Sequence, residues 1–91
     1  MTVKVKFFAY FRDVFDAREK FVDLPEGGTA GDLLNTLCDT RARRSEIFEG
    51  AGLRPLVLVM INGSPLGSFR GMETELAGGD VVAVFPFVAG G

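Results

Sequence analysis

A single amphipathic stripe between residues 29 and 40 constrains the fold of this chain more than any other feature. Thr29 is a favourable N-cap residue, and Asp32 stands three positions later as an acidic form of the capping box. Apolar residues then recur at the helical spacing i, i+3, i+4 and i+7, namely Ala30, Leu33, Leu34 and Leu37. We therefore predict the main helix at about residues 30–40. One helix covers only one face of a sheet, so the other face must meet solvent or a partner.

Four segments of the chain have the pattern of β-strands. In the first, alternate side chains point to opposite faces, with Val3, Val5 and Phe7 on one and Lys4, Lys6 and Phe8 on the other. The others lie at residues 18–24, 56–61 and 81–85. The right-handed crossover rule puts the helix between the second and third strands on one face of the sheet. We expect the first and last strands to lie side by side and parallel at its centre. This organisation predicts an α+β fold in which a mixed sheet carries one main helix on one face.

The connections between these strands carry turn and short-helix signals. Apolar residues at helical spacing predict a short helical turn at residues 10–15, and residues 49–55 are expected to form a loop. Asn62-Gly63 is the signature of a type I′ hairpin turn. The return segment after this turn is placed at the edge of the sheet, because Pro65 interrupts it.

The composition argues against several classes of function. The chain has 91 residues, enough for one domain, and its net charge of −2 gives no electrostatic basis for binding nucleic acid. It has no histidine and a single cysteine, which argues against a metal site and fits a reducing cytoplasm. The longest apolar run, residues 56–61, is far shorter than a membrane span. We therefore expect a cytoplasmic protein that binds no metal, membrane or nucleic acid.

Cys38 and a group of arginines lie close to the main helix. Cys38 borders the apolar stripe and is interpreted as a small core residue, since no histidine is present to activate its thiol; a reactive thiol is the alternative. Arg41, Arg43 and Arg44 are expected to form the solvated C-terminal end of the helical region, where cations suit the helix dipole. A partner-binding role is the alternative for these arginines.

The last residues of the sequence are an unusual ending for a compact chain. An apolar strand runs into Pro86, and the sequence ends in Gly90-Gly91. Glycine has no Cβ, so a Gly-Gly end can enter a channel too narrow for side chains. We predict a domain at residues 1–85 and a flexible tail at 86–91, in which the terminal carboxylate of Gly91 is the reactive group. The alternative is an ordinary frayed end, because the same dipeptide occurs elsewhere in the chain.

The residues that lead to Gly91 are expected to contact a partner. If Val82 and Val84 point towards the helix, Phe85 points to the opposite face and would be exposed beside the tail. Phe85 is therefore the candidate docking anchor; the alternative is that it covers the core under a neighbouring loop. The complete predicted contact segment comprises Phe85, Pro86, Phe87, Val88, Ala89 and Gly90.

The chain resembles the MoaD family, the small subunits of molybdopterin synthase, which are ubiquitin-like sulfur carriers with a β-grasp fold. The resemblance rests on Val5-Lys6-Phe7-Phe8-Ala9 with Phe11-Arg12-Asp13, on the helix at residues 29–37, on Ile61-Asn62-Gly63, and on the region from Leu76 to Gly91. It extends over essentially the whole chain. Where the family usually has a second proline near its end, this chain has Phe87.

The resemblance implies a chemistry for Gly91. An E1-like, MoeB-type adenylyltransferase would use ATP and Mg²⁺ to adenylate the carboxylate, and a sulfur donor enzyme would convert it to a thiocarboxylate. A MoaE-like large subunit would receive the tail, and sulfur would pass to the precursor of the molybdenum cofactor. The chain itself would bind no cofactor and supply no catalytic residue besides Gly91, which agrees with its lack of histidine and of any nucleophile–base constellation.

Other functions can use the same ending. A ubiquitin-like modifier would be joined through Gly91 to substrate lysines, and a sulfur carrier can serve cysteine or thiamin synthesis instead. The thiamin carrier ThiS fits less well, because it is shorter and lacks the Phe-Phe-Ala opening and the Phe-Pro element. A plain interaction module would have no chemistry at Gly91. The sequence leaves these alternatives and the sulfur acceptor open.

Overall fold

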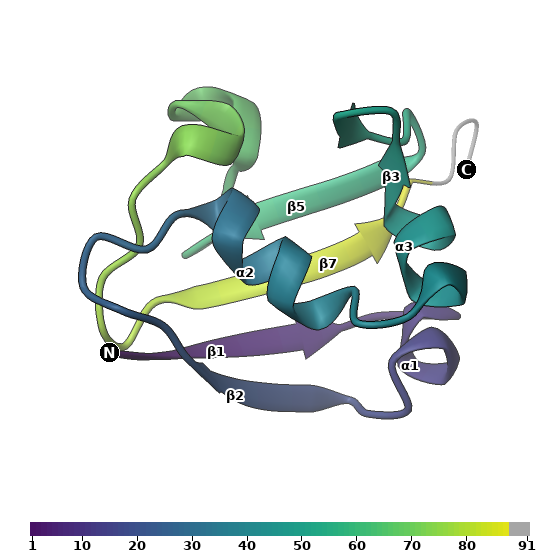
Figure 1. Ribbon diagram of the computed structural model, residues 1–91, viewed down its shortest axis with the longest axis horizontal. Coiled ribbons are helices and arrows are strands. Elements are labelled where there is room, and N and C mark those ends of the chain that lie inside the picture. The colour runs from purple at the N-terminus through teal and green to yellow at the C-terminus, as the bar shows by residue number, and fades with distance from the viewer. Residues whose placement is uncertain (88–91) are drawn as a thin grey trace.

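The computed structural model describes residues 1–87, and its centre is a mixed sheet. The five strands of this sheet lie in the order β2-β1-β7-β5-β6. Their bounds are β1 (Thr2–Phe7), β2 (Glu19–Asp23), β5 (Val57–Ile61), β6 (Ser64–Pro65) and β7 (Val81–Pro86). The main helix, α2 (Ala30–Leu37), crosses one face of the sheet (Figure 1).

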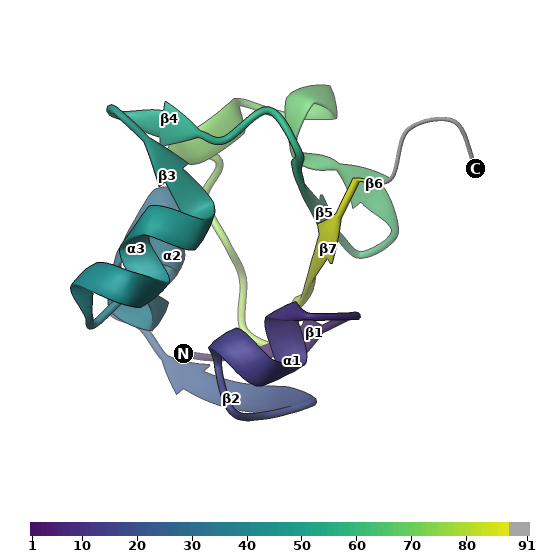
Figure 2. The same cartoon turned by 90° about the vertical axis from the view of Figure 1, so that its right-hand side faces the viewer.

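The first and last long strands, β1 and β7, lie side by side and run parallel at the centre of the sheet. In this register Val5 lies opposite Val82, and Phe7 lies opposite Val84. Strands β2 and β5 pair with them antiparallel on either side. Figure 2 shows α2 and α3 (Arg41–Ile47) together on one side of the sheet. The predicted mixed sheet, with its central parallel pair and its main helix on one face, is confirmed.

The core fills the space between α2 and the sheet. Alternation along β1 and β7 points Val3, Val5, Phe7, Val82 and Val84 inwards, and each is at most 1% exposed. The predicted stripe of α2 meets them, since Ala30, Leu33, Leu34 and Leu37 are all buried. Burying one large apolar side chain contributes about 1.5–3 kcal/mol, so this contact is the main stabilising contribution to the fold.

Helix α2 begins at the predicted capping box. The Asp32 backbone N–H donates to Thr29 Oγ1 at 3.1 Å, and the Thr29 backbone N–H donates to Asp32 Oδ2 at 3.0 Å. The helix ends at Leu37, three residues before the predicted end at residue 40, because Cys38 leaves the helical conformation as its C-cap. The capping box is confirmed, and the predicted length was too long.

The arginines after α2 belong to a separate helix, α3. This corrects the prediction that they form the C-terminal end of the main helical region. Helix α3 has Thr40 as its N-cap, whose Oγ1 accepts the Arg43 N–H at 3.1 Å. The first turn of a helix is electrostatically unfavourable for cations. Other contacts offset this, because Arg43 Nε donates to the Val14 carbonyl at 3.1 Å and Arg43 Nη1 donates to Asp39 at 2.9 Å.

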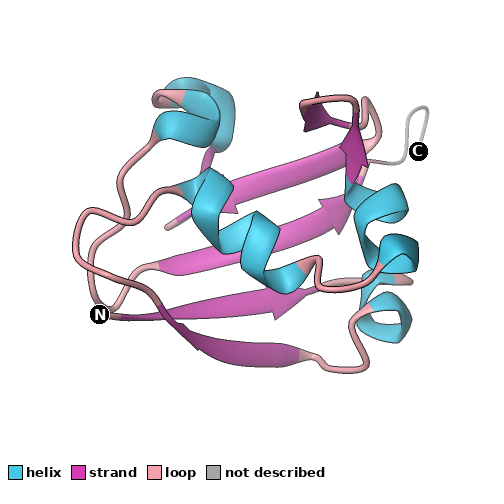
Figure 3. Cartoon of the chain, in the orientation of Figure 1, coloured by secondary structure: helices cyan, strands magenta, loops and turns pink. Residues whose placement is uncertain are grey.

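The short connections agree with the predictions except at residues 49–55. Helix α1 (Phe11–Val14) occupies the predicted helical turn. The predicted loop contains most of a small antiparallel ladder, β3 (Phe48–Glu49) with β4 (Gly52–Leu53), which follows α3 directly (Figure 3). Two-residue strands leave no readable alternation in a sequence, which is why the ladder was missed.

The hairpin after β5 has the predicted turn. Asn62 and Gly63 both have positive φ, of 49° and 85°, as the two central residues of a type I′ turn require. Pro65 ends the short strand β6 at the edge of the sheet, as predicted. Two 3₁₀ turns, η1 (Leu66–Ser68) and η2 (Gly71–Glu73), then lead back towards β7.

Candidate docking face and tail exit

The helix-free face of the sheet carries a cluster of half-buried apolar side chains. Strands β5 and β7 pair so that Leu58 lies opposite Phe85 and Met60 lies opposite Ala83. Residues opposite each other in a ladder share a face, and this face is the one away from buried Val82 and Val84. We call the cluster the docking face, and it consists of Phe8, Leu58, Met60, Ala83 and Phe85.

Phe85 lies on the predicted side of the sheet, but the prediction that it is exposed was wrong. Its ring stacks on the ring of Phe8, with centroids 4.2 Å apart and planes 11° from parallel. Both residues are half-buried as a result. Phe8 was placed correctly on this face by the alternation of β1, but its contact with Phe85 depends on the parallel register of two distant strands, which no local pattern reveals.

Pairing within the sheet continues beyond the predicted end of the last strand. Strand β7 reaches Pro86, which lies opposite Val57. The Phe87 backbone N–H then donates to the Leu56 carbonyl at 2.7 Å. The side chain of Phe87 is nevertheless 52% exposed. Four of the predicted site residues, Val88, Ala89, Gly90 and Gly91, lie outside the described residues, and the division between domain and tail stays a prediction.

A positively charged hollow borders the docking face beside Phe8. It is lined by Lys6, Phe7, Phe8, Arg12, Arg18 and Glu19. Arg12 Nε donates to the Phe7 carbonyl at 3.1 Å, and its guanidinium lies 5.7 Å from the centre of the Phe8 ring. Glu19 is also paired with Lys4, at 3.4 Å. The hollow therefore contains three cations and one carboxylate, an excess of positive charge that no local pattern in the sequence indicates.

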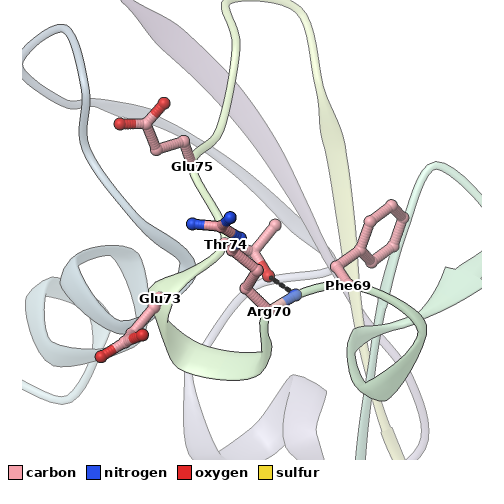
Figure 4. A pocket seen from close by; sticks show the side chains of 5 residues that line it. All are labelled: Phe69, Arg70, Glu73, Thr74 and Glu75. Atoms are coloured by element: carbon pink, nitrogen blue, oxygen red, sulfur yellow. Dashed lines mark hydrogen bonds between the residues drawn. The ribbon is translucent and has the colours of Figure 1, made fainter.

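A second, apolar hollow includes Val57 and Leu58 in its lining and so reaches the residues that pair with the end of β7. A third hollow lies at a distance from that end and is lined by Phe69, Arg70, Glu73, Thr74 and Glu75, where the Arg70 backbone N–H donates to Thr74 Oγ1 at 2.9 Å (Figure 4). These residues follow β6, which pairs with Met60 and Ile61, whereas Pro86 pairs with the other end of β5. No group of three or more potential metal-ligating residues occurs among residues 1–87.

Cys38 is a buried residue of the core, as predicted. Its side chain packs in the main apolar cluster, and burial raises the pKa of its thiol to about 11. A thiol with a raised pKa is a poor nucleophile near neutral pH. In the part of the chain that the structure describes, no helix has the length and apolar character to cross a membrane.

A mixed sheet with a central parallel pair, one main helix across one face and an apolar patch on the other defines a ubiquitin-like β-grasp protein. The family model that matches, described as the ThiS family, covers residues 5–91. The chain belongs to this family of ubiquitin-like sulfur carriers and modifiers, which confirms the resemblance seen in the sequence.

Individual relatives agree with this assignment. Small archaeal modifier protein 3 of Haloferax volcanii is 35% identical over 92 residues, with 100% of both chains covered. A solved structure described as a molybdopterin converting factor, subunit 1, from Pyrococcus furiosus is 34% identical with a TM-score of 0.78, covering 97% of this chain and 99% of that one. Small archaeal modifier protein 1 of H. volcanii is 29% identical with a TM-score of 0.82, covering 96% and 98%.

Proposed function

We propose that the chain is a sulfur carrier whose Gly91 carboxylate is activated and converted to a thiocarboxylate. The observation that carries this proposal is the position of the docking face. Phe85 and Ala83 belong to β7, the strand that leads directly to the end of the sequence. A partner that binds this face therefore lies next to the residues that follow Phe87. The family assignment supports the same interpretation.

The proposed activation follows from the chemistry of a carboxylate. A free carboxylate is a poor electrophile, so an E1-like, MoeB-type enzyme transfers AMP to it from ATP with Mg²⁺. A carboxylate oxygen of Gly91 attacks the α-phosphorus, and pyrophosphate leaves. A sulfur donor at the oxidation level of sulfide then attacks the acyl carbon, and AMP leaves. The chain supplies the carboxylate and the docking face, and its partners supply the catalysis.

The proposed sulfur acceptor is the precursor of the molybdenum cofactor. The name of the P. furiosus structure, a molybdopterin converting factor subunit, supports this choice. In this proposal a MoaE-like large subunit binds the docking face, receives the thiocarboxylate and transfers its sulfur. The thiocarboxylate sulfur attacks the precursor, and water then hydrolyses the resulting thioester. The sulfur stays on the precursor, and the Gly91 carboxylate is regenerated with an oxygen from water.

Protein modification is the second candidate function, and the name of the H. volcanii relative favours it. In that case a lysine amine attacks the adenylated Gly91 carbonyl, AMP leaves, and an isopeptide bond forms. Activation is common to both candidates, so they differ only in the nucleophile. A blot of the tagged chain from its own cells separates them, because a modifier gives larger species that survive boiling in reducing detergent.

The activation step is tested by pyrophosphate exchange with the E1-like enzyme of the same organism. The wild-type chain should support ATP-dependent exchange. A variant with one alanine added after Gly91 should support none, because its reacting carbonyl is no longer terminal, and its unfolding midpoint should match that of the wild type. Equal exchange by the two chains would contradict the proposal.

A further inference from the structure

Among residues 1–87, the last backbone hydrogen bond between β7 and the segment before β5 is flanked by two exposed apolar side chains. Leu56 is 60% exposed and Phe87 is 52% exposed. The bond from the Phe87 N–H to the Leu56 carbonyl continues the register in which Val57 lies opposite Pro86 and Leu58 lies opposite Phe85. Because side chains alternate every residue, Leu56 and Phe87 share the face that carries Leu58 and Phe85. The pair therefore extends the docking face to the end of β7.

The charged group nearest in sequence to this pair is directed elsewhere. Arg54 Nη1 donates to the Ser45 carbonyl at 3.2 Å and lies 3.9 Å from the carboxylate of Glu46, both on α3. The Arg54 backbone N–H also donates to the Ile47 carbonyl at 2.9 Å. These contacts fix the turn that precedes Leu56. They also hold the Arg54 guanidinium against α3, so that Leu56 and Phe87 remain an apolar pair.

The length of the remaining chain limits where a partner can lie. Four residues follow Phe87 in the sequence. Four fully extended residues span at most about 13 Å. While the Phe87 hydrogen bond holds, a protein that grips Gly91 must therefore approach within that distance of Phe87. The exposed side chains at this end of the sheet are Leu56 and Phe87, so they are the apolar groups that such a protein meets there.

We infer that Leu56 and Phe87 form a collar at the end of β7 that packs against an apolar rim around the partner's opening for Gly91. The inferred partner is the adenylating enzyme, so this inference rests on the proposed function. Leu56 and Phe87 act as positioning and recognition residues and take no part in bond making. Burial of two large apolar side chains at the centre of a contact is a common source of binding free energy.

The first test is amide hydrogen exchange of the wild-type chain, which requires no partner. The Phe87 amide should exchange about 5- to 10-fold more slowly than in an unstructured peptide, as a single hydrogen bond at a strand end predicts. Exchange at the unstructured rate would show that the hydrogen bond does not hold in solution, and the inference would be overturned.

The second test measures adenylation kinetics with Leu56→Ser and Phe87→Ala. Both variants keep the backbone groups of the hydrogen bond, and both should raise KM for the carrier about 10-fold with kcat little changed. Phe69→Ala is the matched control, because Phe69 is 45% exposed and lies in the hollow that is remote from the end of β7. The control should keep the wild-type KM.

Two results separate this inference from the proposed function. If the wild-type chain is adenylated and the collar variants have the same KM as Phe69→Ala, the collar is refuted and the carrier function stands. If the wild-type chain is not adenylated at all, the carrier function is refuted. The inferred contact between the collar and the adenylating enzyme is then refuted with it. The exchange rate of the Phe87 amide then still decides whether the hydrogen bond exists.

Discussion

At the scale of single residues, the stacked rings of Phe8 and Phe85 link the fold to the docking face. If Phe85 were an ordinary surface residue, its substitution would lower the free energy of unfolding by no more than about 0.5 kcal/mol. The stack, with ring centroids 4.2 Å apart, changes this expectation. Phe85→Ala and Phe8→Ala should each cost more, and a double-mutant cycle from urea unfolding should give a coupling of about 0.5–1.5 kcal/mol. Strictly additive losses would show that the rings do not contact each other in solution.

Cys38 predicts a specific dependence of stability on alkaline pH. Burial raises the pKa of its thiol in the folded chain to about 11, above the ordinary value of 9.0 expected when the chain unfolds. Between these values the folded chain keeps a proton that the unfolded chain has lost. The stabilisation is therefore complete below about pH 9 and is lost as the pH rises through about 11.

The measurement is the free energy of unfolding as a function of pH for the wild type and for Cys38→Ala. Between about pH 9 and pH 11 the free energy of unfolding of the wild type should fall more steeply with pH than that of Cys38→Ala. Every other titratable group is present in both chains, so the difference between the two slopes reports on the thiol. Parallel curves over this interval would mean that the thiol is accessible to water in the folded state.

At the scale of elements, the capping box of α2 should contribute measurably to stability. Thr29→Ala removes the acceptor of the Asp32 N–H and should cost about 1 kcal/mol in chemical unfolding. Thr36→Ala is a matched control on the same helix, since its hydroxyl only donates to the Asp32 carbonyl and the residue is exposed. The control should change stability by no more than about 0.5 kcal/mol. Equal losses in the two variants would contradict a specific role for the cap.

Elements with a strong local signal were the ones predicted from the sequence. The stripe of α2, its capping box and the Asn62-Gly63 turn each depend on neighbouring residues, and all three are confirmed. Helix α3 was missed because only Ile47 of its seven residues is buried, so it has no apolar stripe. Thr40, a good N-cap residue, was the available signal for its start.

At the scale of the whole molecule, topology was predictable and side-chain contacts between strands were not. The right-handed crossover rule places the main helix on one face of the sheet, and the order of strands and helix favours the parallel pairing of β1 with β7 that the structure has. The exact register, by contrast, depends on packing along the whole sheet. It determines the stack of Phe8 on Phe85 and the hydrogen bond between Phe87 and Leu56. For this reason the pairing of Leu56 with Phe87 emerged only from the structure.

The most direct test of the carrier function is the mass of the C-terminal peptide of N-terminally tagged protein from its own cells, isolated under reducing conditions. The instrument must resolve replacement of oxygen by sulfur from a single oxidation, because the two increments nearly coincide. The carrier function predicts a thiocarboxylate on Gly91. A peptide that carries only the free carboxylate, even when the activating enzyme, ATP and a sulfur donor are supplied, would contradict it.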